Sequence, residues 1–463
     1  MVKQVKSGSK STAGLPEEIG RKRAEAVSRT VIGRKRRKTV QREDVFRISA
    51  LGLDWDIGVM TYSPVGAVTR GADGRKAGFF LLHGGNGDFK SVEPLALLLS
   101  QRFGYKVVSM TFPGRLYLPD PSRDWPGDTI ESDGAARMPI WKKGEVITRD
   151  QYDLVHDDKL RARYGIRTFA RARPRTLFHE RMAAWPVAFE DGMLEACRRH
   201  FPADEFSVYL HGHSTGGAFT AILSQRLENC AGQTEVETAP IGVINRAKHA
   251  WSGSMGKIKG YAKAGPKEPD DVLYDPFTDL YLRTWRDRAR YSGPEALGRE
   301  GAAALMRLPW LMEEILDGWQ EERLRPQFKA EFPVTHNVEG TLAKAARVAA
   351  RRLGLGRKET RALVERYLDY GRYRTGKNAR PVPPVYFVNS RLSRDNSEEA
   401  FSAVVIPMLK ALRPAPRVHL TMVDAGSHIY MEPDGPALPM GIAPVAAYLF
   451  DEAVRGGFFA QAG

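Results

Sequence analysis

A chain of 463 residues with 42% hydrophobic and 27% charged residues has the composition of a soluble globular protein, and its length suggests roughly two to three domains. No apolar run approaches the ~20 residues that a membrane-spanning helix needs, and the N-terminus lacks the apolar stretch of a secretory signal. The two cysteines, Cys197 and Cys230, exclude a disulfide framework. We therefore expect a cytoplasmic protein in which both cysteines pack as small apolar side chains.

The net charge of +15 is concentrated in two segments. Residues 1–40 hold twelve Lys/Arg against three Glu, and residues 341–380 hold twelve Lys/Arg against two Glu and one Asp, so each segment carries +9. The rest of the chain is slightly acidic, and the basicity is therefore local. Because residues 1–44 lack a sustained apolar pattern, we predict a solvated basic arm there, flexible or partly helical. Its basic patch, Arg34–Lys38, is of the kind that binds nucleic acid or anionic membrane. An anionic binding partner for this arm therefore stays an open alternative.

Strand-like and helix-like patterns alternate through the first half of the chain. Short apolar runs predict four strands, at residues 46–49, 57–62, 78–82 and 106–111. A helical pattern precedes the fourth strand, and another resumes near Leu177 after a long aperiodic excursion at residues 117–175. This alternation predicts right-handed β-α-β units, and hence a mostly parallel central sheet with helices on both faces.

The next strand-like run, Phe206–Leu210, leads into Gly-His-Ser-Thr-Gly at residues 212–216, and a helix-compatible run follows from Ala218. Strand, Gly-x-Ser-x-Gly and helix is the context of a nucleophile elbow. The sharp turn projects the Ser214 hydroxyl above the sheet, and its two glycines leave room where a Cβ would clash. The N-terminus of the following helix favours a developing oxyanion.

The second half of the chain resumes the sheet pattern after an interruption. Further strands are predicted at residues 240–245, 382–388 and 418–422, and helices at residues 398–412 and 442–454. Mostly helical signals fill the long insertion between the first and second of these strands. We therefore divide the chain into the basic arm, a core made of residues 45–249 and 381–463, and a helical insertion at residues 250–380.

Four matches, in the right chain order, resemble the α/β-hydrolase superfamily. They are His83-Gly84-Gly85 after the third predicted strand, the elbow, Asp395 after the strand at 382–388, and Gly426-Ser427-His428 after the last strand. The resemblance covers roughly residues 45–250 and 380–455. It implies an α/β-hydrolase fold in which the insertion forms a mainly helical lid or cap over the active site.

The residue types then suggest a mechanism. Ser214 is a weak nucleophile that needs an adjacent base, and His428 would take its proton and later deliver it to the leaving group. Asp395 would hold the imidazole in the required tautomer and stabilise the imidazolium. The backbone N–H groups of Gly85 and Thr215 would form the oxyanion hole, which contributes about 3 kcal/mol per donor.

Some of these assignments have rivals. Asp395 competes with Glu398 and Glu399 just downstream, and with a buried acid supplied elsewhere. Asn86 beside the oxyanion loop and His213 in the elbow are candidate substrate-binding residues.

No cofactor or metal is expected. Gly84 to Gly87 does not fit the Gly-x-Gly-x-x-Gly dinucleotide pattern, and no phosphate-binding loop occurs. A metal site at His83, His211 and His213 would lack carboxylates or cysteines at zinc-like spacing. The sequence thus predicts a serine hydrolase of a bulky carboxylic ester, thioester or amide. Acyl transfer or carbon–carbon bond hydrolysis on the same triad remains open, as does a non-catalytic binding protein with a basic arm. The oligomeric state stays open as well.

Overall fold

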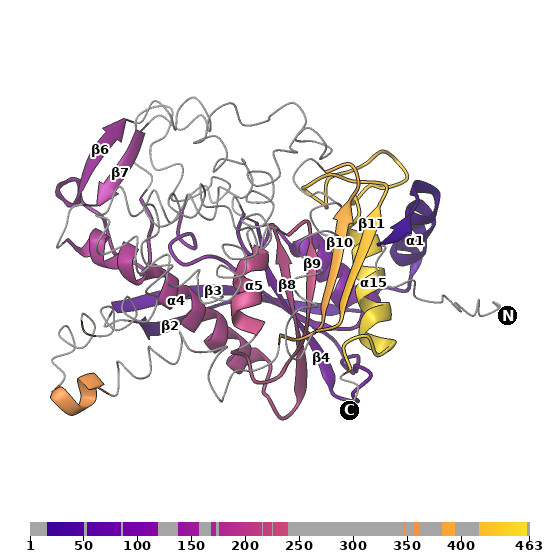
Figure 1. The fold of residues 1–463 in the computed structure, drawn as a ribbon, viewed down its shortest axis with the longest axis horizontal. Helices are drawn as coiled ribbons and strands as arrows, with labels where there is room; N and C mark the ends of the chain where they lie inside the picture. The colour runs from indigo at the N-terminus through magenta and orange to yellow at the C-terminus, as the bar shows by residue number, and fades with distance from the viewer. Residues whose placement is uncertain are drawn as a thin grey trace, which may run out of the picture.

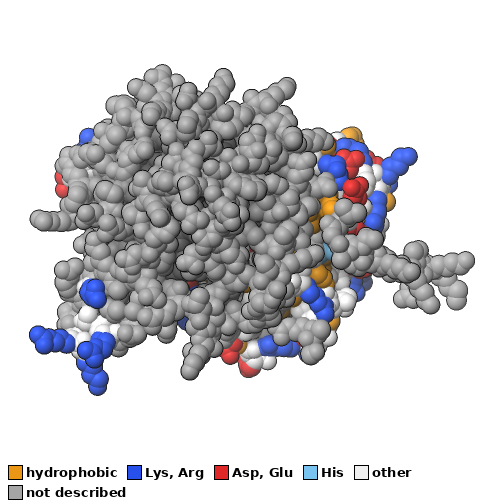
Figure 2. All heavy atoms as spheres, in the orientation of Figure 1, with side chains coloured by type: hydrophobic (Ala, Val, Ile, Leu, Met, Phe, Trp, Pro, Cys, Tyr) orange, Lys and Arg blue, Asp and Glu red, His pale blue; other side chains and the backbone are white. Residues whose placement is uncertain are grey.

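The computed structural model describes twelve stretches of the chain (Figure 1): residues 16–50, 53–84, 87–118, 138–156, 168–172, 176–214, 216–224, 226–238, 347, 356–361, 382–393 and 416–460. The lid prediction for residues 250–380 falls almost wholly outside them. From that insertion only residue 347 and residues 356–361 are described. Figure 2 shows Lys and Arg side chains gathered at the lower left, where Figure 1 places the short helix of residues 357–361.

A single nine-stranded sheet organises the fold, in the order β1-β11-β10-β9-β8-β4-β5-β3-β2. The pairs β2–β3 and β3–β5 are antiparallel, and all the other neighbours are parallel. The strands are β1 (Glu17–Ile19), β2 (Thr39–Ala50), β3 (Leu53–Pro64), β4 (Lys76–Leu82), β5 (Lys106–Met110), β8 (Phe206–His213), β9 (Cys230–Val236), β10 (Val385–Ser390) and β11 (Val418–Val423). Most of these strands are buried along nearly their whole length, as expected of a sheet covered on both faces.

Helices cover the sheet on both sides. One face carries α1 (Arg21–Gly33), α2 (Glu93–Leu97), the π-helical turn η1 (Leu98–Arg102) and α15 (Ala443–Arg455). Phe79 and Leu81 of β4 join this layer, whereas the alternate residue Phe80 does not. The other face carries α4 (Leu177–His200) and α5 (Gly216–Ser224). There α4 comes so close to the sheet that a Cβ at Gly192 would lie 2.8 Å from Ile57 Cδ1. The predicted mostly parallel sheet with helices on both faces is confirmed.

Much of the predicted basic arm is part of this fold. β1 pairs in parallel with β11 and so forms one edge of the sheet, and α1 packs beside α15 (Figure 1). The helix buries Ala24, Ser28 and Val31, which are spaced at steps of four and three and so share one face. Part of the basic patch has packing partners as well, since the Arg34 guanidinium lies 4.4 Å from the Phe103 ring centroid. Small residues on one face of α1 gave no strong apolar pattern, which is why the sequence favoured a solvated arm.

The strand β9, which follows the elbow helix, was not predicted from the sequence. Residues 240–245 lie outside the described residues, and the sheet position next to β8 is taken by β9. Three polar residues of β9, Gln233, Thr234 and Glu235, are buried. A strand that buries polar side chains shows no apolar run, so pattern reading passed over it.

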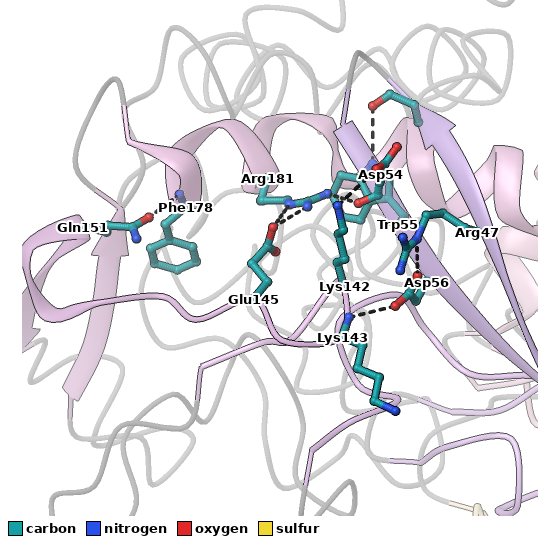
Figure 3. A network of polar contacts seen from close by, with 11 residues as sticks. Arg47, Asp54, Trp55, Asp56, Lys142, Lys143, Glu145, Gln151, Phe178 and Arg181 are labelled. Carbon is teal, nitrogen blue, oxygen red and sulfur yellow. Dashed lines mark hydrogen bonds and ion pairs between the residues drawn. The ribbon is translucent and has the colours of Figure 1, made fainter.

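Part of the predicted excursion is tied to the core by a polar network (Figure 3). Asp56 of β3 accepts hydrogen bonds from Arg47 Nε and from the backbone N–H of Lys143, both at 2.8 Å. The buried Arg181 of α4 pairs with Glu145 and lies over the Trp55 ring at 4.6 Å. Beyond this anchor, β6 (Tyr152–His156) and β7 (Thr168–Ala172) form a separate antiparallel pair. Among the described residues, no helix is long and apolar enough to cross a membrane.

Candidate active site

The nucleophile elbow has the geometry that its sequence predicts. β8 ends at His213 and α5 begins at Gly216, so Ser214 lies in the turn between strand and helix. Ser214 has a φ of 53°, a left-handed conformation that costs a residue with a Cβ about 1–2 kcal/mol. A strained residue of this kind persists where the surrounding packing holds it, and such residues cluster at functional sites.

Close packing on both sides of the turn maintains this strain. A Cβ at Gly212 would lie 2.5 Å from the backbone nitrogen of Gly217. A Cβ at Gly216 would lie 2.7 Å from the carbonyl oxygens of Leu82 and His83. Contacts under 3 Å with backbone cannot be relieved by a rotamer change. The turn is therefore pressed against β4 and against its own helix, and only glycine fits at these two positions.

The loop after β4 reaches the elbow as the sequence predicts. A Cβ at Gly84 would lie 3.2 Å from both Ser214 Cβ and His213 Nδ1, so this backbone runs directly alongside the serine. His83 is fully buried, stacks on Phe112 with ring centroids 4.1 Å apart, and has its Nδ1 2.6 Å from the Gly84 carbonyl oxygen. Burial lowers the pKa of His83 well below its ordinary value. A neutral, buried ring fits the loop-shaping role expected of it.

Several predicted site residues lie outside the described residues. These are Gly85 and Thr215 of the oxyanion hole, the substrate-binding candidate Asn86, and the acid candidates Asp395, Glu398 and Glu399. Their assignments stay predictions.

His428 reaches the elbow from the opposite loop. It follows β11, and its backbone carbonyl oxygen lies 2.9 Å from His213 Nε2. The imidazole rings of His213 and His428 stack with centroids 5.3 Å apart and an interplanar angle of 29°. His213 directly precedes Ser214, so this contact brings the predicted base and the predicted nucleophile into one cluster.

A carboxylate that the sequence did not single out completes this cluster. Glu237 follows β9 directly, is fully buried, and has Oε2 3.4 Å from His428 Nδ1. Its Oε1 accepts the backbone N–H of Ser390 at the end of β10. Glu237 also has a positive φ, 49°, so the chain turns sharply as it leaves the strand. An acidic residue at the carboxyl end of the strand after the elbow helix was the available signal, but β9 had not been predicted from the sequence.

A second buried carboxyl group lies two residues earlier in the chain. Glu235 Oε1 accepts a hydrogen bond of 2.8 Å from the Thr220 hydroxyl of α5. A Cβ at Gly212 would meet Glu235 Oε2 at 2.7 Å, so this carboxyl lies against the floor of the elbow. Burial raises the pKa of Glu235 well above its ordinary value and so favours the uncharged form of the group. Glu235 thus packs under the turn and accepts the hydrogen bond of the Thr220 hydroxyl there.

His213 is itself nearly buried, with 8% of its surface exposed. Burial and the neighbouring His428 lower the pKa of His213 to about 3. The ring therefore stays neutral near pH 7, and its Nε2 can donate to the His428 carbonyl. Its predicted substrate contact stays a prediction, because the contacts seen here are with the protein. In the part of the chain that the structure describes, no group of three or more His, Cys, Asp or Glu residues could hold a metal ion.

A search against protein-family models found no match, and a search of curated proteins found none either. Solved structures do match. A lipase in its open form is 14% identical with a TM-score of 0.38, and the match covers 89% of this chain and 99% of the lipase. A thioesterase domain from the curacin biosynthetic pathway is 11% identical, with a TM-score of 0.33 and coverage of 89% and 99%. A thermostable esterase from Pseudomonas putida is 10% identical, with a TM-score of 0.34 and coverage of 96% and 90%.

These identities and TM-scores are low, so the fold assignment rests on this chain's own geometry. The parallel strands run in the sheet order β11-β10-β9-β8-β4-β5, with β3 antiparallel beside β5, and the elbow lies between the central strand β8 and α5. Ser214, Glu237 and His428 occur in this order along the chain. On this topology and this elbow, the chain has the α/β-hydrolase fold.

Proposed function

We propose that the protein is a serine hydrolase that cleaves a carboxylic ester through an acyl-enzyme intermediate on Ser214. The observation that carries the proposal is the convergence of three chain segments at the carboxyl edge of the sheet. They bring together a serine held at positive φ, a histidine, and a buried carboxylate 3.4 Å from that histidine's Nδ1. A packed loop histidine needs no buried carboxylate at its ring nitrogen, so this pairing favours a catalytic role.

The first half of the reaction forms the acyl-enzyme. Ser214 Oγ attacks the ester carbonyl carbon while its proton passes to His428 Nε2. Glu237 accepts the Nδ1–H of the resulting imidazolium and stabilises its charge. The backbone N–H groups of Gly85 and Thr215 hold the oxyanion of the tetrahedral intermediate, as the resemblance implies. When the ester C–O bond breaks, the departing alcohol takes the proton from His428.

The second half of the reaction releases the acid. A water molecule gives a proton to His428 Nε2 and attacks the acyl carbon, and the second tetrahedral intermediate expels Ser214 Oγ, which recovers the proton. Neutral His213 beside the ring adds no positive charge that would repel the imidazolium. In this proposal residues 250–380 form the lid, and residues 117–175 and 250–380 together determine the choice of substrate. The large insertion favours a bulky acyl or alcohol group.

A fluorophosphonate probe tests the proposal directly, because it reacts only with an activated serine. We expect wild-type protein to be labelled on Ser214 and to hydrolyse p-nitrophenyl esters, and Ser214→Ala to do neither. Unlabelled wild-type protein, or a Ser214→Ala variant that labels and turns over equally well, would overturn the proposal. A series of acyl chain lengths then measures how bulky a substrate the enzyme accepts.

A further inference from the structure

His213 makes contacts that the proposed chemistry does not itself require. It is the last residue of β8, pairs with Val236 of β9 and directly precedes Ser214, and its ring lies between two other loops of the site. On one side the Gly84 backbone approaches Nδ1, so that a Cβ there would be only 3.2 Å away. On the other side Nε2 lies 2.9 Å from the His428 carbonyl oxygen.

The ring also packs against the loop that carries His428 by two aromatic contacts. It stacks on His428 at a centroid distance of 5.3 Å, and it meets Tyr430 edge-on at 4.8 Å with an interplanar angle of 62°. Tyr430 is fully buried and holds the far side of this loop in the core. The His213 side chain thus contacts the ring and the backbone carbonyl of His428, and also the Tyr430 ring that anchors the same loop.

We infer that His213 is a positioning residue that tethers the His428 loop to the nucleophile elbow and so fixes the distance between base and serine. The inference rests on the proposed function of Ser214 and His428. The tether is a hydrogen bond from Nε2–H to the His428 carbonyl, made in a nearly buried setting where few water molecules compete. Because the donor belongs to the residue next to the nucleophile, movement of one loop moves the other.

The sequence neighbour His211 shows that burial alone does not create this arrangement. It lies on the same face of β8, two residues earlier, and is fully buried. Its Nδ1 lies 3.2 Å from the Thr234 hydroxyl of β9, and its ring packs against Phe450 at 5.6 Å. His211 therefore serves as a matched control. It is a buried histidine of the same strand, and its ring also lies near Tyr430 at a centroid distance of 6.2 Å, but its hydrogen bond goes to Thr234 and not to the His428 carbonyl.

Two substitutions at His213 separate the effect of losing the hydrogen bond from the effect of losing the stacked ring. Glutamine places its amide nitrogen close to the position of Nε2 and keeps the donor, whereas phenylalanine keeps the stacked ring and loses the donor. We expect His213→Phe to lower kcat on a p-nitrophenyl ester by about 10- to 100-fold with KM within about threefold, the loss typical of misplaced catalytic groups. His213→Gln should recover most of this loss. His211→Phe should leave kcat within about threefold of wild type.

A readout independent of activity tests the tether itself. Hydrogen exchange of the amides in residues 426–431 should be at least about 10-fold faster in His213→Phe than in wild type and should return toward wild type in His213→Gln. If His213→Phe fails to fold, His213→Asn takes its place, because its amide is one methylene too short to reach the carbonyl. Equal effects of glutamine and phenylalanine on kcat and exchange, or no effect of either, would overturn the inference. An inactive, unlabelled wild-type protein would overturn the proposed function, while the exchange experiment would still decide the tether.

Discussion

We expect Glu237→Gln to remove most of the proposed esterase activity while leaving the fold intact. Two contacts of the carboxylate bear on this expectation: Oε1 accepts the backbone N–H of Ser390, and Oε2 lies 3.4 Å from His428 Nδ1. In the variant the amide oxygen keeps the Ser390 bond, so the NH2 group must face Nδ1. An NH2 group only donates, so Nδ1 must be unprotonated and the imidazole proton moves to Nε2. In that tautomer His428 cannot accept the proton of Ser214.

The size of the effect follows from the same distance. A carboxylate 3.4 Å from an imidazolium nitrogen gains about 5 kcal/mol of Coulomb energy at an effective dielectric constant of about 20. This charge pair exists only while His428 is protonated, which is the case in the transition state and not in the resting enzyme. We therefore expect kcat to fall by about 10³- to 10⁴-fold with KM little changed.

A matched pair of variants makes the test decisive. Glu235→Gln replaces a carboxyl group of the same strand, whose pKa burial raises well above its ordinary value, with a neutral amide, so kcat and the melting temperature should stay close to wild type. Asp395→Asn tests the acid that the sequence favoured. Steady-state kinetics on a p-nitrophenyl ester, with circular dichroism to confirm folding, distinguishes the outcomes. If Glu237→Gln keeps kcat within about 10-fold of wild type while Asp395→Asn loses about 10³-fold, the reasoning from the observed contact is refuted.

Two further predictions concern stability, and a third concerns the packing of the elbow. Burial lowers the pKa of His211 to about 3 from an ordinary 6.5. The unfolded chain therefore takes up a proton that the folded chain refuses, and stability falls as pH drops below 6.5, by about 2 kcal/mol for this histidine near pH 5. Urea unfolding near pH 7 and pH 5 should show a smaller loss for His211→Gln. Arg181→Met leaves the Glu145 carboxylate without its buried partner and should cost about 3–5 kcal/mol in thermal unfolding. An unchanged melting temperature would contradict the network in Figure 3. Gly216→Ala should abolish probe labelling, whereas Gly20→Ala, where a Cβ meets nothing within 4 Å, should keep it.

The features that the sequence predicted well share one property, which is that a local rule decides them. β4 and β5 are short apolar runs buried on both faces, and they lie within two residues of their predicted bounds. The elbow was predictable because a positive φ at Ser214 leaves room only for glycine at Gly212 and Gly216. The position of His428 followed from chain order alone.

The features that were missed depend on tertiary contacts. β9 buries Gln233, Thr234 and Glu235, and hydrogen bonds to neighbouring elements compensate for this burial, as when Thr234 donates to the Leu210 carbonyl. No apolar run can mark such a strand. Because β9 was not predicted, the acid at its end was not considered by name. The arm was misread for a related reason, since β1 has only three residues and becomes a strand by pairing with β11, about 400 residues later in the chain.

Two glutamates at the end of β9, Glu235 and Glu237, have the same side chain but lie in different surroundings. Glu235 and Glu237 are both buried, so exposure does not distinguish them. Glu235 lies under the elbow, against the packed glycines and the Thr220 hydroxyl, where burial raises the pKa of its carboxyl group well above the ordinary value. Glu237 follows the last residue of the strand, where a positive φ redirects the chain toward the Ser390 N–H and the His428 ring. The backbone N–H and the imidazole at that position suit a carboxylate, whereas hydroxyl partners in a buried setting suit an uncharged acid. In the proposed triad, the turn at Glu237 therefore directs the acid toward His428, and the turn at Ser214 places the proposed nucleophile between strand and helix.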